Sequence, residues 1–347
     1  MAIMNLVLPY MLVGLLFASK VFSQSSCVTK KDKNMQETSC VHLGLTDVPL
    51  KEIPPDTAVL VLSFNALKAV STSSFKNMRK LVRLDLSDNS LTSFQVDFPV
   101  MLQELILANN SLKSVPDLSR LSSLTKLDLS NNHISSLQDT DFKGLKKLKS
   151  LELQKNRIDS VSEKAFRDLS SLNHLDLSHN QLWQLPNVLI SELVQLGSFS
   201  LMGNRLTNIP DSFFDGLDSL EKVYLDKNPW ICNCALHYFK EWLVDNAYNV
   251  YHLANGIPVN DELSVVCAGG TPLYNYHMDT CLGNEGGGGH KNIMLKLPNV
   301  LKDNSLVSEF PIIMEETSTV PNSETIPNAS IDTWVITIAV VMDKLYS

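Results

Sequence analysis

Apolar side chains recur along the middle of the chain in one repeated order, with 21 to 24 residues from one copy to the next. The order is L-x-x-L-x-L-x-x-N-x-L, and it is clearest from Leu148 to Ile158 and from Leu172 to Leu182. In each copy the central L-x-L alternates apolar and other side chains, which is typical of a short strand with one buried face. The pattern therefore predicts a strand in every copy, followed by a turn and a returning segment.

Repeats of this length and order are typical of leucine-rich repeats, in which a single unit cannot bury its own apolar edge and the units must stack. They run without interruption over 57–227, as seven full units and the start of an eighth. We therefore predict an α/β solenoid, a leucine-rich repeat horseshoe with a parallel sheet on its concave side. The copies begin at Thr57, Leu81, Leu102, Leu124, Leu148, Leu172, Leu196 and Leu220.

One asparagine in each copy lies where the chain leaves the strand. The backbone there is buried between neighbouring coils, and an unpaired buried amide or carbonyl costs about 1 to 3 kcal/mol. An asparagine side chain both donates and accepts, so we expect each one to bond the turn backbone of adjacent coils. The eight residues are Asn65, Asn89, Asn110, Asn132, Asn156, Asn180, Asn204 and Asn228.

The segment before the repeats predicts export and a first cap. An apolar run from Leu6 to Ala18, followed by small residues up to Ser23, predicts a signal peptide over 1–23, with a buried amphipathic helix as the alternative. Cys27 and Cys40 then enclose twelve mostly polar residues. We expect them to form a disulfide in an N-terminal cap over 24–56, with a small projecting hairpin; metal binding is the competing interpretation.

Four further cysteines follow the last repeat and predict a second cap over 228–281. Cys232 and Cys234 are too close in sequence to pair comfortably, so each should reach Cys267 or Cys281. A helical period places Leu236, Phe239, Trp242 and Leu243 on one side, which should cover the open end of the last coil. A zinc site that combines these cysteines with His237 is the alternative.

Polar positions of the repeats predict a binding surface. Side chains that alternate with the strand leucines should line the concave side in two columns. Four acids follow the central column, which favours a partner with a basic face, while a solvated polar surface is the alternative. The residues expected to contact a protein are Arg83, Asp85, Glu104, Lys126, Asp128, Glu152, His174, Asp176, Lys222 and Tyr224.

His174, Asp176 and Ser178 have the residue types of a catalytic triad. They lie at alternate positions of one predicted strand, so their side chains point in parallel and do not converge on one reacting atom. Serine also recurs at this position of other units, as Ser63, Ser87 and Ser130. We therefore expect no enzymatic activity, no cofactor and no metal site.

The formal net charge of the chain indicates which class of partner to expect. The formal charge is −8, and it becomes −9 without 1–23, because Lys20 is their only charged side chain. An acidic surface argues against nucleic acid and favours a partner with a basic face. Asn109 and Asn328 begin the two N-glycosylation sequons of the chain.

The C-terminal cap carries a resemblance to a known family. The run from Ala235 to Tyr251, followed by Cys267, by Pro272 to Tyr276 and by Cys281, closely resembles the C-terminal flank of the platelet glycoprotein Ib alpha chain family. The spacing of Cys27 and Cys40 resembles the N-terminal hairpin of that family, and Leu91 to Asp97 resembles its short second repeat. The resemblance covers about residues 27 to 281. The repeats alone would also fit the leucine-rich alpha-2-glycoprotein and the variable lymphocyte receptors of jawless vertebrates.

The resemblance implies disulfides from Cys232 to Cys267 and from Cys234 to Cys281. It also implies a protein partner, von Willebrand factor, held across the concave face between the N-terminal hairpin and a mobile loop after the capping helix. Other receptor subunits are further partners of this family type. In the family, an acidic segment with sulfatable tyrosines binds thrombin after the last cysteine; here 282–332 contains no tyrosine, so thrombin binding is not expected.

The mobile loop corresponds to 251–266 of this chain and is several residues shorter than in the family. Asn255-Gly256 in its middle is a strong two-residue hairpin signal. We expect this loop to pair edge-on with the ligand as an added strand pair, with Pro258 on the outer edge. The loop residues expected to contact the partner are Tyr251, Asn255, Gly256, Asp261 and Glu262.

The remaining sequence predicts a flexible linker over 282–332 and a short apolar tail over 333–347. A bilayer needs about 20 apolar residues, so the ten from Thr333 to Met342 fit either a truncated membrane anchor or a soluble terminus. The sequence as a whole predicts an extracellular adhesion receptor ectodomain, secreted or at the cell surface, that binds a plasma adhesive protein. The alternative is a soluble secreted plasma glycoprotein or immune recognition protein that sequesters a protein ligand.

Overall fold

The computed structural model describes residues 26–32, 35–97 and 101–278. The chain divides into two compact units, Met1–Glu285 and Gly286–Ser347, and every described residue belongs to the first. The predicted signal peptide, linker and apolar tail lie outside the described residues, as do Cys281 and Asn328. None of the described helices has the length and apolar character needed to cross a bilayer.

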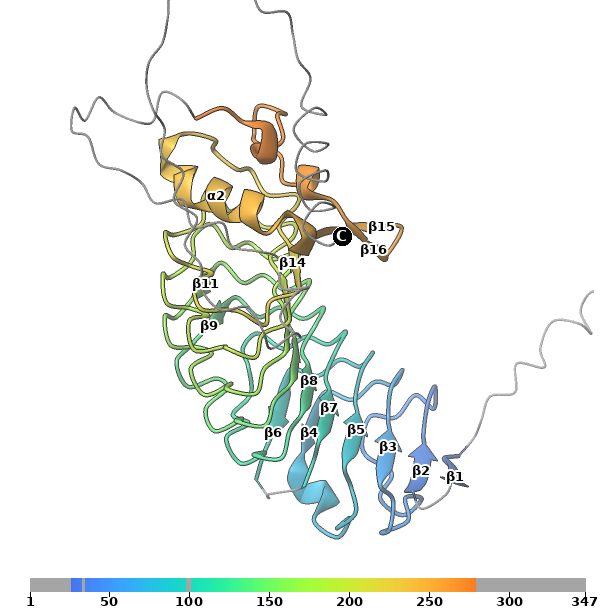
Figure 1. Cartoon of the computed structure of the whole chain (residues 1–347). Coiled ribbons are helices and arrows are strands. Elements are labelled where there is room, and N and C mark those ends of the chain that lie inside the picture. Colours follow the sequence, from blue (N-terminus) through green and yellow to red (C-terminus); the bar gives the residue numbers. More distant parts are fainter. Residues whose placement is uncertain (1–25, 33–34, 98–100, 279–347) are drawn as a thin grey trace, which may run out of the picture. The chain divides into compact units, whose positions relative to one another are not determined.

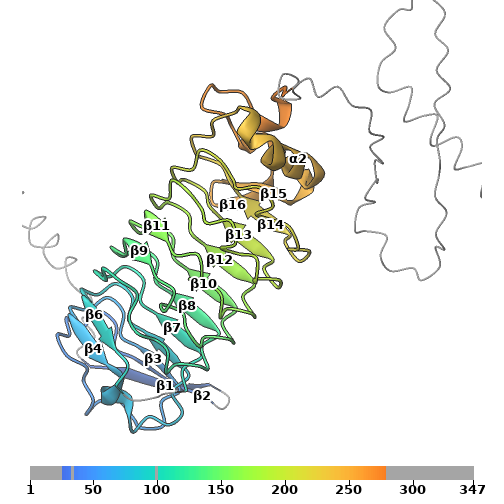
Figure 2. The same cartoon turned by 90° about the vertical axis from the view of Figure 1, so that its left-hand side faces the viewer.

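One sheet of twelve strands runs through the described unit (Figures 1 and 2). Its eight central strands lie at the predicted L-x-L positions, and each pairs in parallel with the strand of the next coil. The predicted leucine-rich repeat horseshoe with a parallel sheet is thereby confirmed. These strands are β3 (Val59–Val61), β5 (Arg83–Asp85), β7 (Glu104–Ile106), β8 (Lys126–Asp128), β10 (Ser150–Glu152), β12 (His174–Asp176), β13 (Ser198–Ser200) and β14 (Lys222–Tyr224).

The core follows the repeated leucines along the whole stack. Strand leucines such as Leu84 and Leu151 are fully buried, and so are Phe75, Phe142 and Phe166 of the returning segments. The rings of Phe142 and Phe166 stack with centroids 5.8 Å apart, which continues the packing from one coil to the next. Each coil therefore stabilises its neighbours, as the repeat pattern predicts.

The predicted asparagine ladder is present in every unit. Asn156 is typical: its Oδ1 accepts from the amide of Ile134 at 3.0 Å, and its Nδ2 donates to the carbonyls of Leu129 and Leu153 at 2.9 and 3.0 Å. Its side chain thus bonds backbone of its own coil and of the preceding coil. The same combination recurs at Asn65, Asn89, Asn110, Asn132, Asn180, Asn204 and Asn228.

The outer side of the array contains turns and very short strands. β4 (Ala69–Ser71) pairs with β6 (Ser93–Gln95), β9 (Ser136–Leu137) pairs with β11 (Ser160–Val161), and a single 3₁₀ turn, η1, spans Thr72–Phe75. Among the described residues of the array there is no α-helix. The helical part of the predicted α/β class is therefore confined to the C-terminal cap, because these return segments are too short for regular helices.

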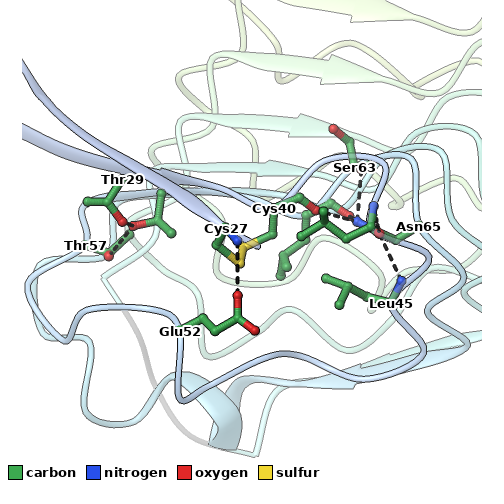
Figure 3. Close-up of a disulfide and its surroundings, with 11 residues drawn as sticks. Cys27, Thr29, Cys40, Leu45, Glu52, Thr57, Ser63 and Asn65 are labelled. Carbon is green, nitrogen blue, oxygen red and sulfur yellow. Dashed lines mark hydrogen bonds between the residues drawn. A yellow bond between two sulfur atoms is a disulfide. The ribbon is translucent and has the colours of Figure 1, made fainter. Parts of the chain in front are cut away.

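The N-terminal cap extends the sheet beyond the first repeat. β1 (Val28–Asp32) and β2 (Met35–Ser39) form an antiparallel hairpin, and β2 pairs in parallel with β3. A disulfide joins Cys27 to Cys40, with 4.3 Å between their Cα atoms, so neither thiol is free to bind metal (Figure 3). Asn65 Nδ2 donates to the carbonyl of Cys40 at 2.7 Å, which links the disulfide to the first ladder asparagine. The cap thus supplies a paired edge for β3.

The C-terminal cap begins at the last ladder asparagine. After a short turn, η2 (Cys234–Leu236), the helix α2 (His237–Asp245) lies across the end of the coil stack (Figure 1). Phe239 and Leu243 of α2 are fully buried, and the Trp242 ring stacks on Phe214 of the last coil with centroids 4.1 Å apart. The predicted apolar side of the helix therefore covers the last coil.

A disulfide from Cys232 to Cys267 closes this cap, which is the pairing that the family resemblance implied. Cys234 is also disulfide-bonded, and its expected partner Cys281 lies outside the described residues. The chain between the cysteines forms η3 (Ala247–Asn249), the hairpin of β15 (Val250–Ala254) and β16 (Ile257–Asn260), and the turns η4 (Glu262–Ser264) and η5 (Leu273–Asn275). β15 pairs in parallel with β14, so the hairpin continues the sheet.

Candidate protein-binding surface

Strand register brings most of the predicted surface residues into two rows across the sheet. One row joins Arg83, Glu104, Lys126, Ser150, His174, Ser198 and Lys222 as successive partners. The second row joins Asp85, Ile106, Asp128, Glu152, Asp176, Ser200, Tyr224 and then Tyr251 of the cap hairpin. Neighbouring members lie about 4.8 Å apart along the rows, so the surface has protein-scale width.

The acidic side chains differ in how far their charge is already balanced. The Arg83 guanidinium lies 3.4 Å from Glu104 Oε2 and 4.0 Å from Asp85 Oδ2. No such arginine partner faces Asp128, Glu152 or Asp176 among the described residues. The acidic residues without an arginine partner therefore lie on β8, β10 and β12, in the middle of the array, with Lys126 and His174 on the same strands.

His174 modifies this acidic centre. Its Nε2 lies 3.3 Å from Glu152 Oε1, and the hydrogen bond to Glu152 raises the pKa of His174 although burial works against it. Burial works to raise the pKa of Glu152, but the hydrogen bond from His174 and the nearby positive charge outweigh it and lower that pKa. The Asp176 carboxyl is more deeply buried, and this burial raises its pKa. The three groups form one titrating cluster on the concave surface.

The geometry of His174, Asp176 and Ser178 does not form a triad. Ser178 is buried, and its backbone amide donates to Asp176 Oδ1 at 2.7 Å. Ser87 and Ser130 make the same contact with Asp85 and Asp128, so it is a feature of the repeat. His174 contacts Glu152 and not Ser178. These serines therefore hold the ends of the strands.

The sequence predicts that Tyr224 is an exposed contact residue, but the structure shows it largely buried. It is only 9% exposed, because its ring packs 6.2 Å from the ring of Tyr251 on the adjacent strand. Lys222 lies 6.0 Å from the centre of the Tyr251 ring and remains exposed. Lys222 is therefore accessible to solvent at this end of the surface and Tyr251 is partly accessible, whereas Tyr224 is largely covered.

The cap loop forms the hairpin that Asn255-Gly256 predicts. Asn255 and Gly256 have φ values of +53° and +80°, and Ala254 pairs with Ile257 across the turn. The pair beside a two-residue turn is the hydrogen-bonded one, so the next pair, Leu253 and Pro258, is not. The proline nitrogen therefore faces away from β15, on the outer edge.

β16 ends the sheet as an edge strand. All four of its residues are exposed, and Ile257 is 66% exposed. No described strand pairs with its outer side. The predicted contact residue Asp261 has a structural contribution as well, because its Oδ1 accepts from the amide of Leu263 at 3.0 Å and its Oδ2 lies 3.1 Å from His252 Nδ1. Glu262 is half-buried in the same turn, η4.

A cavity at the base of the hairpin was not predicted from the sequence. It has a volume of about 450 Å³ and is lined by Asp226, Lys227, His252, Asp261 and Val266, among others. Asp226 is 7% exposed, its Oδ1 lacks a hydrogen-bond partner, and burial raises its pKa. The one sequence signal is that an acid occupies a position where Ser87, Ser130 and Ser178 stand in other units.

Two further predictions concern glycosylation of Asn109 and metal binding. Asn109 is exposed at the turn after β7, where a glycan would be accessible. Among the described residues, no group of three or more histidine, cysteine or acidic side chains is placed to hold a metal ion.

Comparison with known proteins shows which proteins the chain is similar to. The leucine-rich repeat family model matches residues 55–112 and 122–182. The chain is 48% identical over 274 residues to the platelet glycoprotein Ib alpha chain of Mus musculus, covering 77% of this chain and 37% of the relative. It is 37% identical over 263 residues to the same protein of Canis lupus familiaris, covering 74% of this chain and 39% of the relative.

A shorter match joins the repeats to human opticin, with 37% identity over 107 residues, 28% of this chain and 32% of the relative. This chain therefore spans less than half the length of these relatives. The long matches cover about three quarters of this chain, and the fold has the stacked coils and disulfide-bonded caps expected of the resemblance. The chain is a leucine-rich repeat protein similar to the platelet glycoprotein Ib alpha chain.

Proposed function

We propose that the chain is the ligand-binding part of an extracellular adhesion receptor, and that it captures a plasma adhesive protein with a basic face. The observation that carries this proposal is the continuity of the acidic concave rows with a free edge strand, through Tyr251 of β15. A partner can therefore meet charge on the sheet face and backbone groups on the edge at once.

The two contacts supply different properties of binding. The three carboxylates of β8, β10 and β12 outnumber the cationic groups of Lys126 and His174 on these strands, so they accelerate association with a basic partner and make it sensitive to salt. On the outer edge of β16 Pro258 supplies a carbonyl but no N–H, so an added strand pairs with that carbonyl and with neighbouring backbone groups, while the exposed Ile257 and Val259 side chains pack beside it. In this proposal, strand pairing at the outer edge of β16 sets the affinity, and the charges on the concave face set the association rate.

The family resemblance identifies a candidate partner of this chemistry, the basic A domain of von Willebrand factor. The experiment immobilises that domain and measures binding of the segment from Gln24 to Cys281 at several salt concentrations. We expect salt-sensitive binding and a fall in association rate of at least tenfold when Asp128, Glu152 and Asp176 are replaced by serine. Absence of binding at low salt would refute this partner.

The edge contact has its own test in Gly256→Val. No heavy atom lies within 4 Å of a Cβ placed on Gly256, so the substitution acts through its φ of +80°, which valine adopts only with strain. We expect faster dissociation, by at least tenfold. Gly216→Val is the matched control, because Gly216 has a φ of +77° and equally open surroundings but lies on an outer turn. Equal effects of the two variants on dissociation would contradict strand addition.

A further inference from the structure

One coil of this acidic protein carries a run of lysines. Lys143, Lys146, Lys147 and Lys149 lie within seven residues, and all four are exposed. The whole chain has a formal charge of −8 and a pI near 5.5, so its net field repels polyanions. The proposed binding surface does not use this local cluster of positive charge.

The fold directs these side chains outward on one flank. Leu145 and Leu148 are fully buried, and the amide of Leu148 donates to the carbonyl of Leu145 at 3.0 Å. The turn between these two anchors leaves Lys146 and Lys147 facing solvent. Lys149 follows directly, one residue before β10, and its amide donates to the carbonyl of Thr125 in the preceding coil at 2.8 Å. We name Lys143, Lys146, Lys147 and Lys149 the basic flank.

The repeat itself does not require lysine at these positions. The preceding coil has Ser122 and Ser123 in place of Lys146 and Lys147, and the following coil has Ser170 and Ser171. Thr125 and Asn173 stand at the position of Lys149. The lysines are therefore bordered on both sides by small polar residues, which leave them accessible and can hydrogen-bond an anion beside them.

Neighbouring acids do not neutralise the basic flank. Within the described ranges no carboxylate lies within 4.0 Å of any of its four ammonium groups. The nearest acids along the chain have other partners: Asp141 accepts from the amide of Gln138 at 2.8 Å, and Asp168 accepts from the amide of Gly144 at 2.7 Å. Arg167, at the position of Lys143 in the next coil, is also exposed, and its Nε lies 4.0 Å from Asp168 Oδ1.

We propose that the basic flank binds a sulfated glycosaminoglycan chain. Short lysine-rich clusters are typical of heparin and nucleic-acid contacts, and ammonium groups pair with sulfates as point charges. The aromatic residues beside the flank, Phe142 and Phe166, are fully buried, so no ring is available for base stacking. No large apolar side chain of this flank is exposed for insertion into lipid. The disulfide-bonded caps favour an oxidising, extracellular setting, where such polysaccharides occur.

The test is chromatography of the intact chain on heparin with a sodium chloride gradient, together with binding to a heparin of defined length. The variant Lys146→Ser, Lys147→Ser, Lys149→Thr copies the sequence of the preceding coil, so it should fold normally. We expect the unaltered chain to be retained and the variant to lose at least tenfold in affinity at 0.15 M salt. The slope of log affinity against log salt should fall by about two to three, one for each lost contact.

The control removes the same charge elsewhere, through Lys30→Ser, Lys68→Ser and Lys113→Ser, all at exposed positions. It should elute close to the unaltered chain, and both variants should keep the urea midpoint of unfolding. Equal losses in the two triple variants, or no loss in the first, would overturn the proposal. Competition by single-stranded DNA or by anionic lipid vesicles as effective as that by heparin would also overturn it, because a polysaccharide site must prefer heparin.

Discussion

At the scale of single residues, the ladder asparagines offset a backbone strain that the repeat contains. The residue before each of them has a positive φ, and seven of these eight residues are not glycine: Phe64, Asp88, Asn109, Asn131, Lys155, His179 and Lys227. A non-glycine residue in this conformation costs about 1–2 kcal/mol. The three or more hydrogen bonds of each asparagine hold the turn in place, so the two features belong together.

Asn156→Ala should therefore be strongly destabilising. The change leaves the buried Ile134 amide without its acceptor, at a cost of about 1–3 kcal/mol. It also removes one of two donors from each of the Leu129 and Leu153 carbonyls, which keep Asn132 and Asn180 respectively. We expect the free energy of unfolding to fall by more than about 2 kcal/mol, measured by urea denaturation. Asn173→Ala, at an exposed position with one backbone bond, is the control. Similar losses in both variants would contradict a special structural value of the ladder.

His174 gives the concave surface a pH-dependent contribution to stability. Its pKa is raised above 6.5 by the hydrogen bond to Glu152 and by the charges of Glu152 and Asp176, while burial and Lys126 act in the opposite direction. A raised pKa means that the protonated form is favoured on folding, so its stabilisation is complete below about pH 6.5 and is lost as the pH rises through the folded-state pKa.

The difference in urea midpoint between the unaltered chain and His174→Gln should therefore be larger at pH 6 than at pH 9. His133→Gln, away from this carboxylate pair, should show no such change. A difference that stays constant from pH 6 to pH 9 would mean that the contact between His174 and Glu152 has no electrostatic value. Measurements at constant ionic strength are needed, because salt screens partly exposed pairs.

At the scale of elements, the C-terminal cap is held by a buried aromatic contact between α2 and Trp230, whose Nε1 donates to the carbonyl of Leu225 in the last coil at 3.2 Å. Phe239 of α2 is fully buried, with its ring centroid 4.9 Å from that of Trp230. Phe239→Ala should cost about 3–5 kcal/mol and loosen α2 from the last coil. We expect faster proteolysis between 237 and 267 and a change in tryptophan fluorescence. Tyr248→Ala, where the ring is 53% exposed, is the control and should change neither.

Most elements could be predicted because each follows from a short pattern. Alternating leucines predict the eight central strands, paired cysteines predict the caps, and Asn255-Gly256 predicts the β15–β16 turn. The parallel pairing of β2 with β3 and of β15 with β14 could not be predicted, because Gln36 to Ser39 and Val250 to Ala254 lack the L-x-L pattern. Their pairing depends on where the caps place them, which is a tertiary effect.

The candidate binding surface could be predicted from the sequence to about the same extent as the helices and strands. Register follows from the repeat, so the two rows from Arg83 to Tyr224 could be listed in advance. Burial at the junction between array and cap could not, because it depends on packing of the cap on the last coil. That packing buries Tyr224 against Tyr251 and leaves Asp226 Oδ1 without a hydrogen-bond partner. A repeated sequence pattern cannot predict the contacts between the cap and the last coil, because they occur only once in the structure.

At the scale of the whole described unit, stability is local, because each coil contacts only its neighbours. The Cys27–Cys40 disulfide closes one end, and its sequence separation of 13 residues corresponds to roughly 3 kcal/mol in the chain-entropy model. The Asn65 side chain donates a hydrogen bond to the Cys40 carbonyl, and β2 pairs with β3. Loss of the disulfide should therefore loosen the first coils. Coils near the other cap keep their own neighbours and disulfide.

Replacing Cys27 and Cys40 by serine should therefore raise amide hydrogen exchange in a graded way along the chain. We expect the fastest exchange from 35 to 75, smaller effects up to about β7, and unchanged protection from β10 to α2, since coupling in a repeat array passes only between adjacent units. Reduction of the Cys232–Cys267 bond should give the mirror image, with loosening that starts at β14 and β15. If either change raised exchange uniformly over all coils, the array would unfold as one cooperative body, and the concave rows and the cap edges could not respond separately to a ligand.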